Sequence, residues 1–309
     1  MNTQANAMHE SAMSRQIAPA AVPATRLFYW SVRRELWEHR SIYLAPLAAA
    51  GVFLAGFLIS SVRLAGRMRA ALALDPMHQH EKLAQPYDYA AGMVMLASLL
   101  VGLYYCLEAL QSERRDRSIL FWKSLPVSDL TTVFSKATIP IVIVPLLTWA
   151  VTAITMIVMW LLNAAVVAAY GMNAAALCTR LSLFQMCLML LYHLVTVHSL
   201  WHAPFYGWLL MVSAWARRAV FLWAFLPPLA ICALEKIVFN SSHFGALLMY
   251  RLTGGPEAMA MATGSMPINP GTHLTPGRFL TTPGLWIGLA ITAAFLIAAV
   301  WLRRYRGPI

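Results

Sequence analysis

Charged residues are scarce in this chain of 309 residues. Lys, Arg, Asp and Glu together make up 11% of it, whereas soluble domains average about 25%. Hydrophobic residues make up 60%. A soluble protein of this length needs far more charge to cover its surface. The composition therefore excludes an ordinary soluble domain and predicts an integral membrane protein.

Several motifs that would bring chemistry are also missing. No GxxxxGK[ST] phosphate loop occurs, so the chain has no usual cradle for a nucleotide. No CxxC pair and no HExxH sequence occur, and we read the four cysteines as buried thiols. Residues 1–24 lack the apolar core of a secretory signal and are predicted to form a disordered cytoplasmic tail. We expect no catalytic residue, metal or cofactor on this chain.

Six apolar runs are long enough to cross a membrane, which takes about 20 residues in a helix. The fourth run is too long for one straight span and must tilt, kink at Pro204 or include an interfacial turn. Pro227 and Pro228 lie within the fifth, and proline is tolerated in such helices because neighbouring helices satisfy the freed carbonyls. The pattern predicts an all-α integral membrane protein with one transmembrane domain over residues 25–305 and a cytoplasmic C-terminus at 303–309. The predicted spans are residues 41–62, 89–110, 138–162, 181–213, 220–239 and 283–302.

The net charge of +11 bears on orientation. Nucleic-acid binding is the usual alternative for a basic chain, but here the basic residues cluster beside the apolar runs. With the N-terminus in the cytoplasm, the cytoplasmic segments hold 15 Lys and Arg residues and the opposite side holds seven. Positive charge favours the cytoplasmic side, so we predict both termini in the cytoplasm and no nucleic-acid partner.

Residues 25–40 read TRLFYWSVRRELWEHR and predict an elbow helix on the membrane surface. Two tryptophans lie a heptad apart beside an apolar line, and charged side chains fill the rest. Such helices are held by aromatic anchoring and by cations near anionic headgroups. The alternative is that the helix only anchors the first span. The residues assigned to this interfacial helix are Trp30, Arg33, Arg34, Glu35 and Trp37.

The loop after the second span combines dense charge with exposed apolar residues. A charge run at 113–117 is followed by the apolar letters ILFW at 119–122, outside any span. Pro126 then stops the helix, and Ser128 is placed to cap a new one. An exposed apolar patch in a short loop is costly unless a partner or the bilayer covers it. We interpret the loop as a docking element, with an interfacial helix resting on lipid as the alternative.

At this point the sequence resembles a known family. The run ERRDRSILFWKSLPVSD at 113–129, preceded by RRELWEHRS at 33–41, looks like the permease subunit of bacterial ATP-binding-cassette transporters of the type-2 (ABC2) permease family. The stretches LWHAPFYGWLLMVSAWARR at 200–218 and LPPLAICALEK at 226–236 are similar as well. The resemblance covers most of residues 25–305, and the motif at 113–129 is its most specific part.

The resemblance implies an exporter permease in the bacterial inner membrane, with six transmembrane helices in each subunit. Two such subunits, expected as a homodimer, would pair above two separate ATPase subunits that bind ATP and Mg. This chain would then be a non-enzymatic subunit that exports an amphipathic or hydrophobic substrate such as a peptide, antibiotic or lipid-like molecule. The resemblance also assigns residues 113–126 as a cytoplasmic coupling helix. The coupling residues are Glu113, Arg114, Arg115, Asp116, Arg117, Ser118, Phe121, Trp122 and Lys123.

Two acids lie in or beside the apolar runs. An ionised carboxylate is costly in the bilayer, at roughly 2.5–3.5 kcal/mol for a charged residue at the centre of a span. We therefore expect Glu108 and Glu235 near span ends, in structural ion pairs, with a role in substrate or proton binding as the alternative. Glu108 has Arg115 as a candidate partner, and Glu235 an interfacial one.

Three histidines in the fourth run suggest metal or haem binding as an alternative function. His193, His198 and His202 lie along the fourth run, and the last two are four residues apart, on one helix face. Histidines at that spacing can bind a metal, although a site needs further ligands. Interhelical hydrogen bonds are the simpler interpretation. The alternatives to a permease are an intramembrane metal- or haem-binding protein and a non-transporting sensor or assembly factor that docks an ATPase.

Overall fold

The computed structural model describes residues 23–61, 66, 76–118, 127–169, 182–255 and 276–306. In these ranges all regular elements are helices, and six are long and apolar enough to cross a membrane. The prediction of an all-helical, multi-pass membrane protein is thus confirmed. The predicted N-terminal tail lies almost wholly outside the described residues. The six helices cover Ser41–Ser60, Lys82–Arg115, Asp129–Ala169, Leu183–Trp201, Val220–Phe239 and Pro283–Tyr305.

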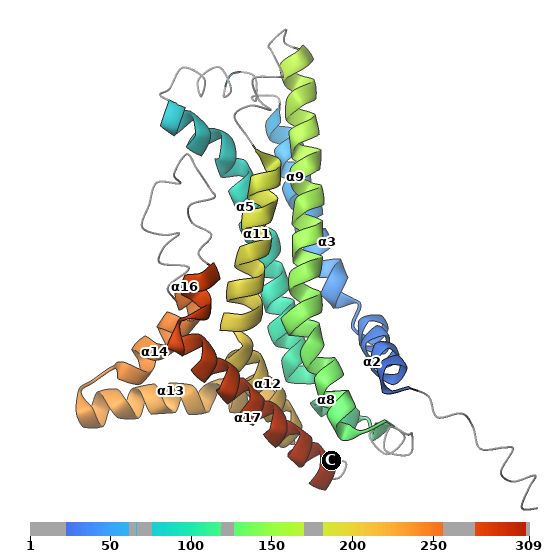
Figure 1. The fold of residues 1–309 in the computed structure, drawn as a ribbon, viewed down its shortest axis with the longest axis vertical. Helices are drawn as coiled ribbons and strands as arrows, with labels where there is room; N and C mark the ends of the chain where they lie inside the picture. The colour runs from blue at the N-terminus through green and yellow to red at the C-terminus, as the bar shows by residue number, and fades with distance from the viewer. Residues whose placement is uncertain are drawn as a thin grey trace, which may run out of the picture.

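Four helices run along the long axis of the molecule (Figure 1). They are α3 (Ser41–Ser60), α5 (Pro76–Glu108), α9 (Val144–Ala169) and α11 (Leu183–His193). The helices α3, α5 and α9 all contact one another, and α11 packs on α9. Their shared core is apolar and includes the fully buried Tyr87. This part of the fold needs few polar contacts, because apolar side chains can face either the core or lipid.

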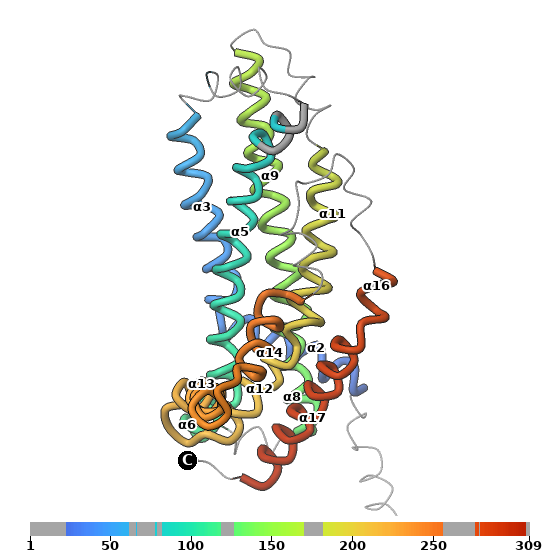
Figure 2. The backbone as a smooth tube through the Cα atoms, turned by 90° about the vertical axis from the view of Figure 1, so that its left-hand side faces the viewer, coloured from blue at the N-terminus to red at the C-terminus, as the bar shows by residue number. Residues whose placement is uncertain are grey.

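The remaining large helices gather at one end of this bundle. They are α12 (Ala203–Trp215), α13 (Val220–Phe239), α14 (His243–Leu252) and α17 (Pro283–Tyr305). Helices α12 and α17 pack closely against each other. In both views α13 lies across the direction of the four long helices (Figures 1 and 2). The predicted fifth span therefore forms a helix of the expected length that does not run alongside the others.

The same end also carries three further helices. These are α2 (Ala24–Glu38), α6 (Gln111–Arg115) and α8 (Asp129–Thr138), and α8 contacts both α2 and α17. The Ser128 side chain accepts a hydrogen bond from the Thr131 backbone N–H at 3.1 Å, so it caps α8 as predicted. The first and last helices of the described chain thus meet at one end of the bundle.

The long fourth run forms two helical segments that are separated by a bend. After α11 the chain continues as a π-helix, η3 (Leu194–Trp201), and then bends at His202 into α12. Pro204 lies in the first turn of α12, where its missing N–H has no partner to lose. Of the three possibilities for this run, a bend is the one observed, and it lies at His202, two residues before Pro204.

The fifth run forms one helix through its two prolines, which membrane helices tolerate as expected. Helix α13 continues through Pro227 and Pro228. Pro228 has no N–H to donate to the carbonyl of Ala224, four residues earlier. The indole Nε1 of Trp208 donates to that carbonyl instead, at 3.0 Å. A neighbouring helix therefore supplies the bond that the proline removes, as membrane helices commonly require.

We predict that Trp208→Phe destabilises the protein by about 1–3 kcal/mol, because it leaves the Ala224 carbonyl without its donor. Chemical unfolding in detergent measures this difference. Trp301→Phe is the matched control, because Trp301 is exposed at 60% and keeps its ring contact with Tyr305 as phenylalanine. Equal effects of the two substitutions would show that the indole bond does not support α13.

Candidate functional site

Glu35 on α2 is the most deeply buried acid in the described chain, with no exposed surface. Lys136 of α8 donates from Nζ to both carboxylate oxygens, at 2.8 and 2.9 Å. The hydroxyl of Tyr105 on α5 donates to Oε2 at 2.8 Å. Lys136 is itself 1% exposed. A buried ion pair with every oxygen satisfied therefore fixes the elbow helix to α5 and α8.

A second buried acid, Glu113 of α6, shares the same lysine. Lys136 Nζ lies 3.0 Å from Glu113 Oε1, and Arg34 Nη2 donates to the same oxygen at 3.1 Å. Arg303 of α17 donates through Nη1 to the other oxygen of Glu113. Its Nε also donates to Asp129 Oδ1 at 2.9 Å. We call these residues the ionic cluster: Arg34, Glu35, Glu113, Asp129, Lys136 and Arg303.

The ionic cluster contains three carboxylates and three cations, so its formal charge is zero. Removing charges from water is expensive, and a buried pair is tolerable only when the remaining hydrogen-bonding capacity is satisfied. Its members come from α2, α6, α8 and α17, and Asp129 begins α8. Removing any one charge leaves its partners uncompensated, so the four segments are held in one arrangement.

The charge state of Glu35 follows from its neighbours. Burial by itself would raise the pKa of Glu35. The positive charges of Lys136 and Arg34, with hydrogen bonds from Lys136 and Tyr105, outweigh burial and lower the pKa to about 2. Glu35 is therefore ionised at neutral pH, and the cluster is held by charge rather than by neutral hydrogen bonds.

The turn between α5 and α6 is fixed to α12 as well. Ser213 Oγ accepts hydrogen bonds from the backbone N–H groups of Leu110 and Gln111, both at 3.1 Å, and donates to the Leu107 carbonyl at 2.8 Å. Arg114 donates from Nη1 to the Ala214 carbonyl at 2.6 Å. The start of the predicted coupling segment is thus bonded to α12 as well as to the ionic cluster.

The predicted coupling residues divide into four groups. Glu113 and Arg114 are buried, and the sequence did not indicate this. The side chains of Arg115, Asp116 and Arg117 are exposed, and Arg117 takes a left-handed backbone conformation at φ 58°, which ends the helical turn. Ser118 is half-buried and donates to the Glu113 carbonyl at 3.3 Å. The remaining three, Phe121, Trp122 and Lys123, lie outside the described residues.

The outer face of the elbow helix is aromatic. Trp30 and Trp37 are 48% and 67% exposed. The Arg33 guanidinium lies over both rings, 5.0 and 4.8 Å from their centres. Glu35 and Arg34 point to the opposite side, into the ionic cluster. Of the charges assigned to this helix, two therefore serve internal packing, and Arg33 remains with the exposed aromatic pair.

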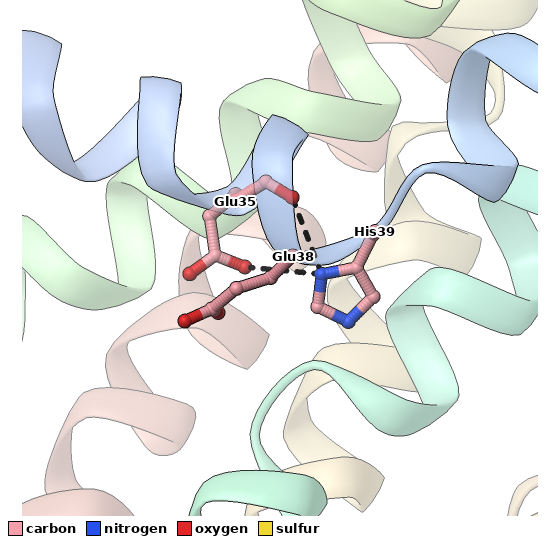
Figure 3. A group of neighbouring side chains, drawn as sticks. All are labelled: Glu35, Glu38 and His39. Atoms are coloured by element: carbon pink, nitrogen blue, oxygen red, sulfur yellow. Dashed lines mark hydrogen bonds and ion pairs between the residues drawn. The ribbon is translucent and has the colours of Figure 1, made fainter.

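Glu35, Glu38 and His39 bring one ligand atom each within 4.8 Å of one another, which is close enough for a metal ion (Figure 3). His39 Nδ1 lies 3.3 Å from the Glu35 carbonyl and 4.0 Å from Glu35 Oε2. Both carboxylate oxygens of Glu35 are already bonded to Lys136, however. A cation at this point would have to displace an ammonium group, so the geometry favours an ion-pair anchor over a metal centre.

A cavity of about 530 Å³ opens beside the cluster. It lies between the end of the elbow helix and α6, and acidic side chains outnumber basic ones along its wall. Polar walls and an open mouth suit a charged group from another molecule better than an apolar ligand. Its lining residues are Glu38, His39, Glu108, Ser112, Glu113, Arg115, Asp116 and Ser118.

The two acids expected in ion pairs have different surroundings. Glu108 lies 3.9 Å from Arg115, the partner proposed for it, at the wall of the cavity. Glu235 has no cation within ion-pair distance among the described residues. Its carboxylate instead accepts from the backbone N–H groups of His243 at 2.6 Å and Phe244 at 2.8 Å. Glu235 thus caps the N-terminus of α14 from the preceding helix.

Sequence reasoning missed four members of this site. Asp129 appeared only as the last residue of the motif at 113–129. Lys136 and Arg303 counted only as cytoplasmic positive charges, and Tyr105 only as part of an apolar span. One signal was available: Lys136 follows the apolar Val133 by three residues and precedes a long apolar run, which places it on the inner face of a helix. Nothing local indicated that Glu35, about a hundred residues earlier, is its partner.

No family model, curated protein or solved structure matches this chain. The assignment of a function therefore depends on the sequence motifs and on the geometry described above.

We predict that Lys136→Met destabilises the protein by roughly 3–5 kcal/mol, because Glu35 and Glu113 lose the cation that they share. Chemical unfolding in detergent measures this loss. Lys236→Met is the matched control, since Lys236 is exposed on α13, and its effect is expected to stay within about 0.5 kcal/mol. A loss no larger than that of the control would mean that the cluster does not hold the helices together.

The cluster also predicts a dependence of stability on pH. Glu35 is more acidic in the folded protein, with a pKa of about 2, than in the unfolded chain, with a pKa near 4.5. Its contribution is therefore fully present above pH 4.5 and is lost as the pH falls towards 2. The gap in melting temperature between wild type and Glu35→Gln is expected to narrow over that interval. Glu38→Gln, at a half-exposed position, serves as control, and a gap that stays constant down to pH 2.5 would contradict the prediction.

Proposed function

We propose that this chain is the transmembrane permease subunit of an ATP-driven exporter, resembling the ABC2 permease family. Three features support the proposal: six apolar helices, the motif at 113–129, and the lack of a phosphate loop, which requires the nucleotide to bind elsewhere. The subunit itself is not an enzyme. A separate ATPase, in two copies, binds ATP and Mg, and a second permease subunit completes a homodimer.

The observation that carries this proposal is the bonding of Glu113. It stands at the start of the predicted coupling segment, and buried ion pairs join it to Arg34 of the elbow helix, Lys136 of α8 and Arg303 of α17. A movement of the segment therefore acts on three helices at once. A helix bundle that switches between two arrangements needs such a rigid connection at the point where the ATPase binds.

The surface left for an ATPase is the exposed part of the same segment. Arg115, Asp116 and Arg117 project from it, and the apolar residues at 119–122 follow in the sequence. The open polar cavity beside Arg115 offers acidic groups to a basic side chain of the partner. In this arrangement the segment faces the cytoplasm, both termini are cytoplasmic, and the protein lies in the bacterial inner membrane. ATP-driven closure of the ATPase pair pushes the segment and tilts the spans.

The cargo class follows from the surfaces. Much of α13 is apolar and exposed, including Phe221, Leu229 and Ile237 at 62%, 64% and 79%. Lipid or the second subunit covers such a surface in a membrane. Charged groups are rare along the spans, so an amphipathic or hydrophobic molecule such as a peptide, an antibiotic or a lipid-like compound fits better than a sugar.

The test is a double substitution, Phe121→Ala with Trp122→Ala, in the permease co-expressed with its ATPase. We expect co-purification and ATPase stimulation to be lost, while membrane insertion is unchanged, because the apolar contact with the motor is removed. Stimulated ATP hydrolysis in proteoliposomes is the measurement. Trp301→Ala with Tyr305→Ala removes an exposed aromatic pair at the end of α17 and serves as control. Full stimulation in the loop variant would refute the docking assignment.

A further inference from the structure

Three histidines form a file in the fourth span, apart from the ionic cluster. His193 ends α11, His198 lies within the π-helix η3, and His202 follows it. In an α-helix, residues five apart point in different directions. The wider π-turn hydrogen-bonds residues five apart, here through the His202 N–H and the Val197 carbonyl at 3.0 Å. The π-helix therefore brings His193 and His198 onto one face, and His202 continues the file.

The three imidazole rings follow one another at nearly equal spacing. The centres of His193 and His198 are 5.7 Å apart, and those of His198 and His202 are 5.4 Å apart, both edge-to-face. Two imidazoles that each place a nitrogen about 2.0 Å from one metal ion have ring centres about 6 Å apart when the ion lies in line between them, and about 5–6 Å apart when the angle is bent. Ordinary aromatic pairs have the same spacing. The spacing therefore permits a bound ion but does not distinguish it from ordinary aromatic packing. The hydrogen bonding of the rings distinguishes the two.

Two ring nitrogens in the file are buried and have no hydrogen-bond partner, Nδ1 of His193 and Nδ1 of His202. His202 is 7% exposed, and its Nε2 lies 3.3 Å from the Leu252 carbonyl. A carbonyl only accepts, so Nε2 carries the proton, and Nδ1 of the neutral ring holds a free lone pair. A buried acceptor without a donor costs free energy. A metal ion would satisfy it, and π-turns are frequent at functional sites.

The charged groups near the three histidines favour a monovalent ion over a divalent one. The described residues bring no carboxylate into ion-pair contact with these rings, since the histidine that has such a contact is His39. The cationic Arg251 donates to the Trp201 carbonyl, next to His202, at 3.1 Å. The cost of burying an ion grows with the square of its charge, so a monovalent ion costs about a quarter as much as a divalent one. Zinc sites usually have four ligands, often anionic, which this file lacks.

We propose that His193, His198 and His202 form an intramembrane site for a soft monovalent transition-metal ion, copper(I), bound between adjacent imidazoles. His198 is the central ring and belongs to both pairs. The three rings lie in a file and do not converge, so coordination is by two nitrogens at a time. Imidazole is a suitable ligand for copper. This proposal does not rest on the proposed permease function, because the three histidines lie apart from the coupling segment.

The experiment measures copper(I) binding to the full-length protein purified in detergent, under anaerobic reducing conditions, by competition with a chromophoric copper(I) chelator. Wild type is expected to bind stoichiometrically, and His198→Ala to lose affinity on the order of 100-fold. His243→Ala is the matched control, because the His243 side chain is outside the file and its contact with Glu235 is through the backbone. X-ray absorption of the wild-type complex is expected to show nitrogen neighbours with imidazole scattering.

Several results would overturn the proposal. They are no copper(I) bound by wild type, equal binding by wild type and His198→Ala, or absorption spectra with sulfur neighbours only, which would indicate binding to methionine or cysteine. Tighter binding of zinc than of copper(I), lost in His198→Ala, would overturn the choice of ion. If His198→Ala does not fold, His198→Asn keeps a polar group in the span, and the wild-type spectrum tests the site without any variant.

Discussion

The arrangement of this protein depends on one buried ammonium group between two buried carboxylates. Lys136 forms ion pairs with Glu35 of α2 and with Glu113 of α6. Arg303 of α17 forms an ion pair with the other carboxylate oxygen of Glu113. Ionic groups away from water must be matched closely, which makes this contact far more selective than apolar packing. Apolar helices in lipid can slide or rotate at little cost, whereas a shared buried charge permits one register.

This constraint explains why the two ends of the molecule differ. The four long helices are held mainly by apolar contacts around residues such as Tyr87 and Met159. At the other end α2, α6, α8, α12 and α17 meet through charge and through hydrogen bonds to Ser213. A force applied at α6 is carried by stiff, directional bonds before it reaches the bundle. The proposed motor contact lies beside these bonds.

The histidine file is a second polar feature, set within an apolar helix. The ionic cluster satisfies its buried charges from within the chain, whereas the file leaves two ring nitrogens without partners. A buried polar group without a partner calls for an explanation, and a bound ion supplies one. The two features therefore divide the molecule into an anchoring site and a binding site.

The sequence by itself determined the class of protein, the six apolar helices and the cap at Ser128. Those properties depend on composition and on neighbours a few residues apart, which hydropathy and periodicity record. A bend in the fourth run was one of three possibilities. The prolines of the fifth run were expected to be tolerated, but the donor to the Ala224 carbonyl comes from another helix and had no local signal. Only the tertiary structure decided that Glu35 and Lys136, separated by 101 positions, are partners. Pairing of distant charges leaves no local pattern, and a π-turn that aligns three histidines depends on backbone hydrogen bonds that the order of residues does not display.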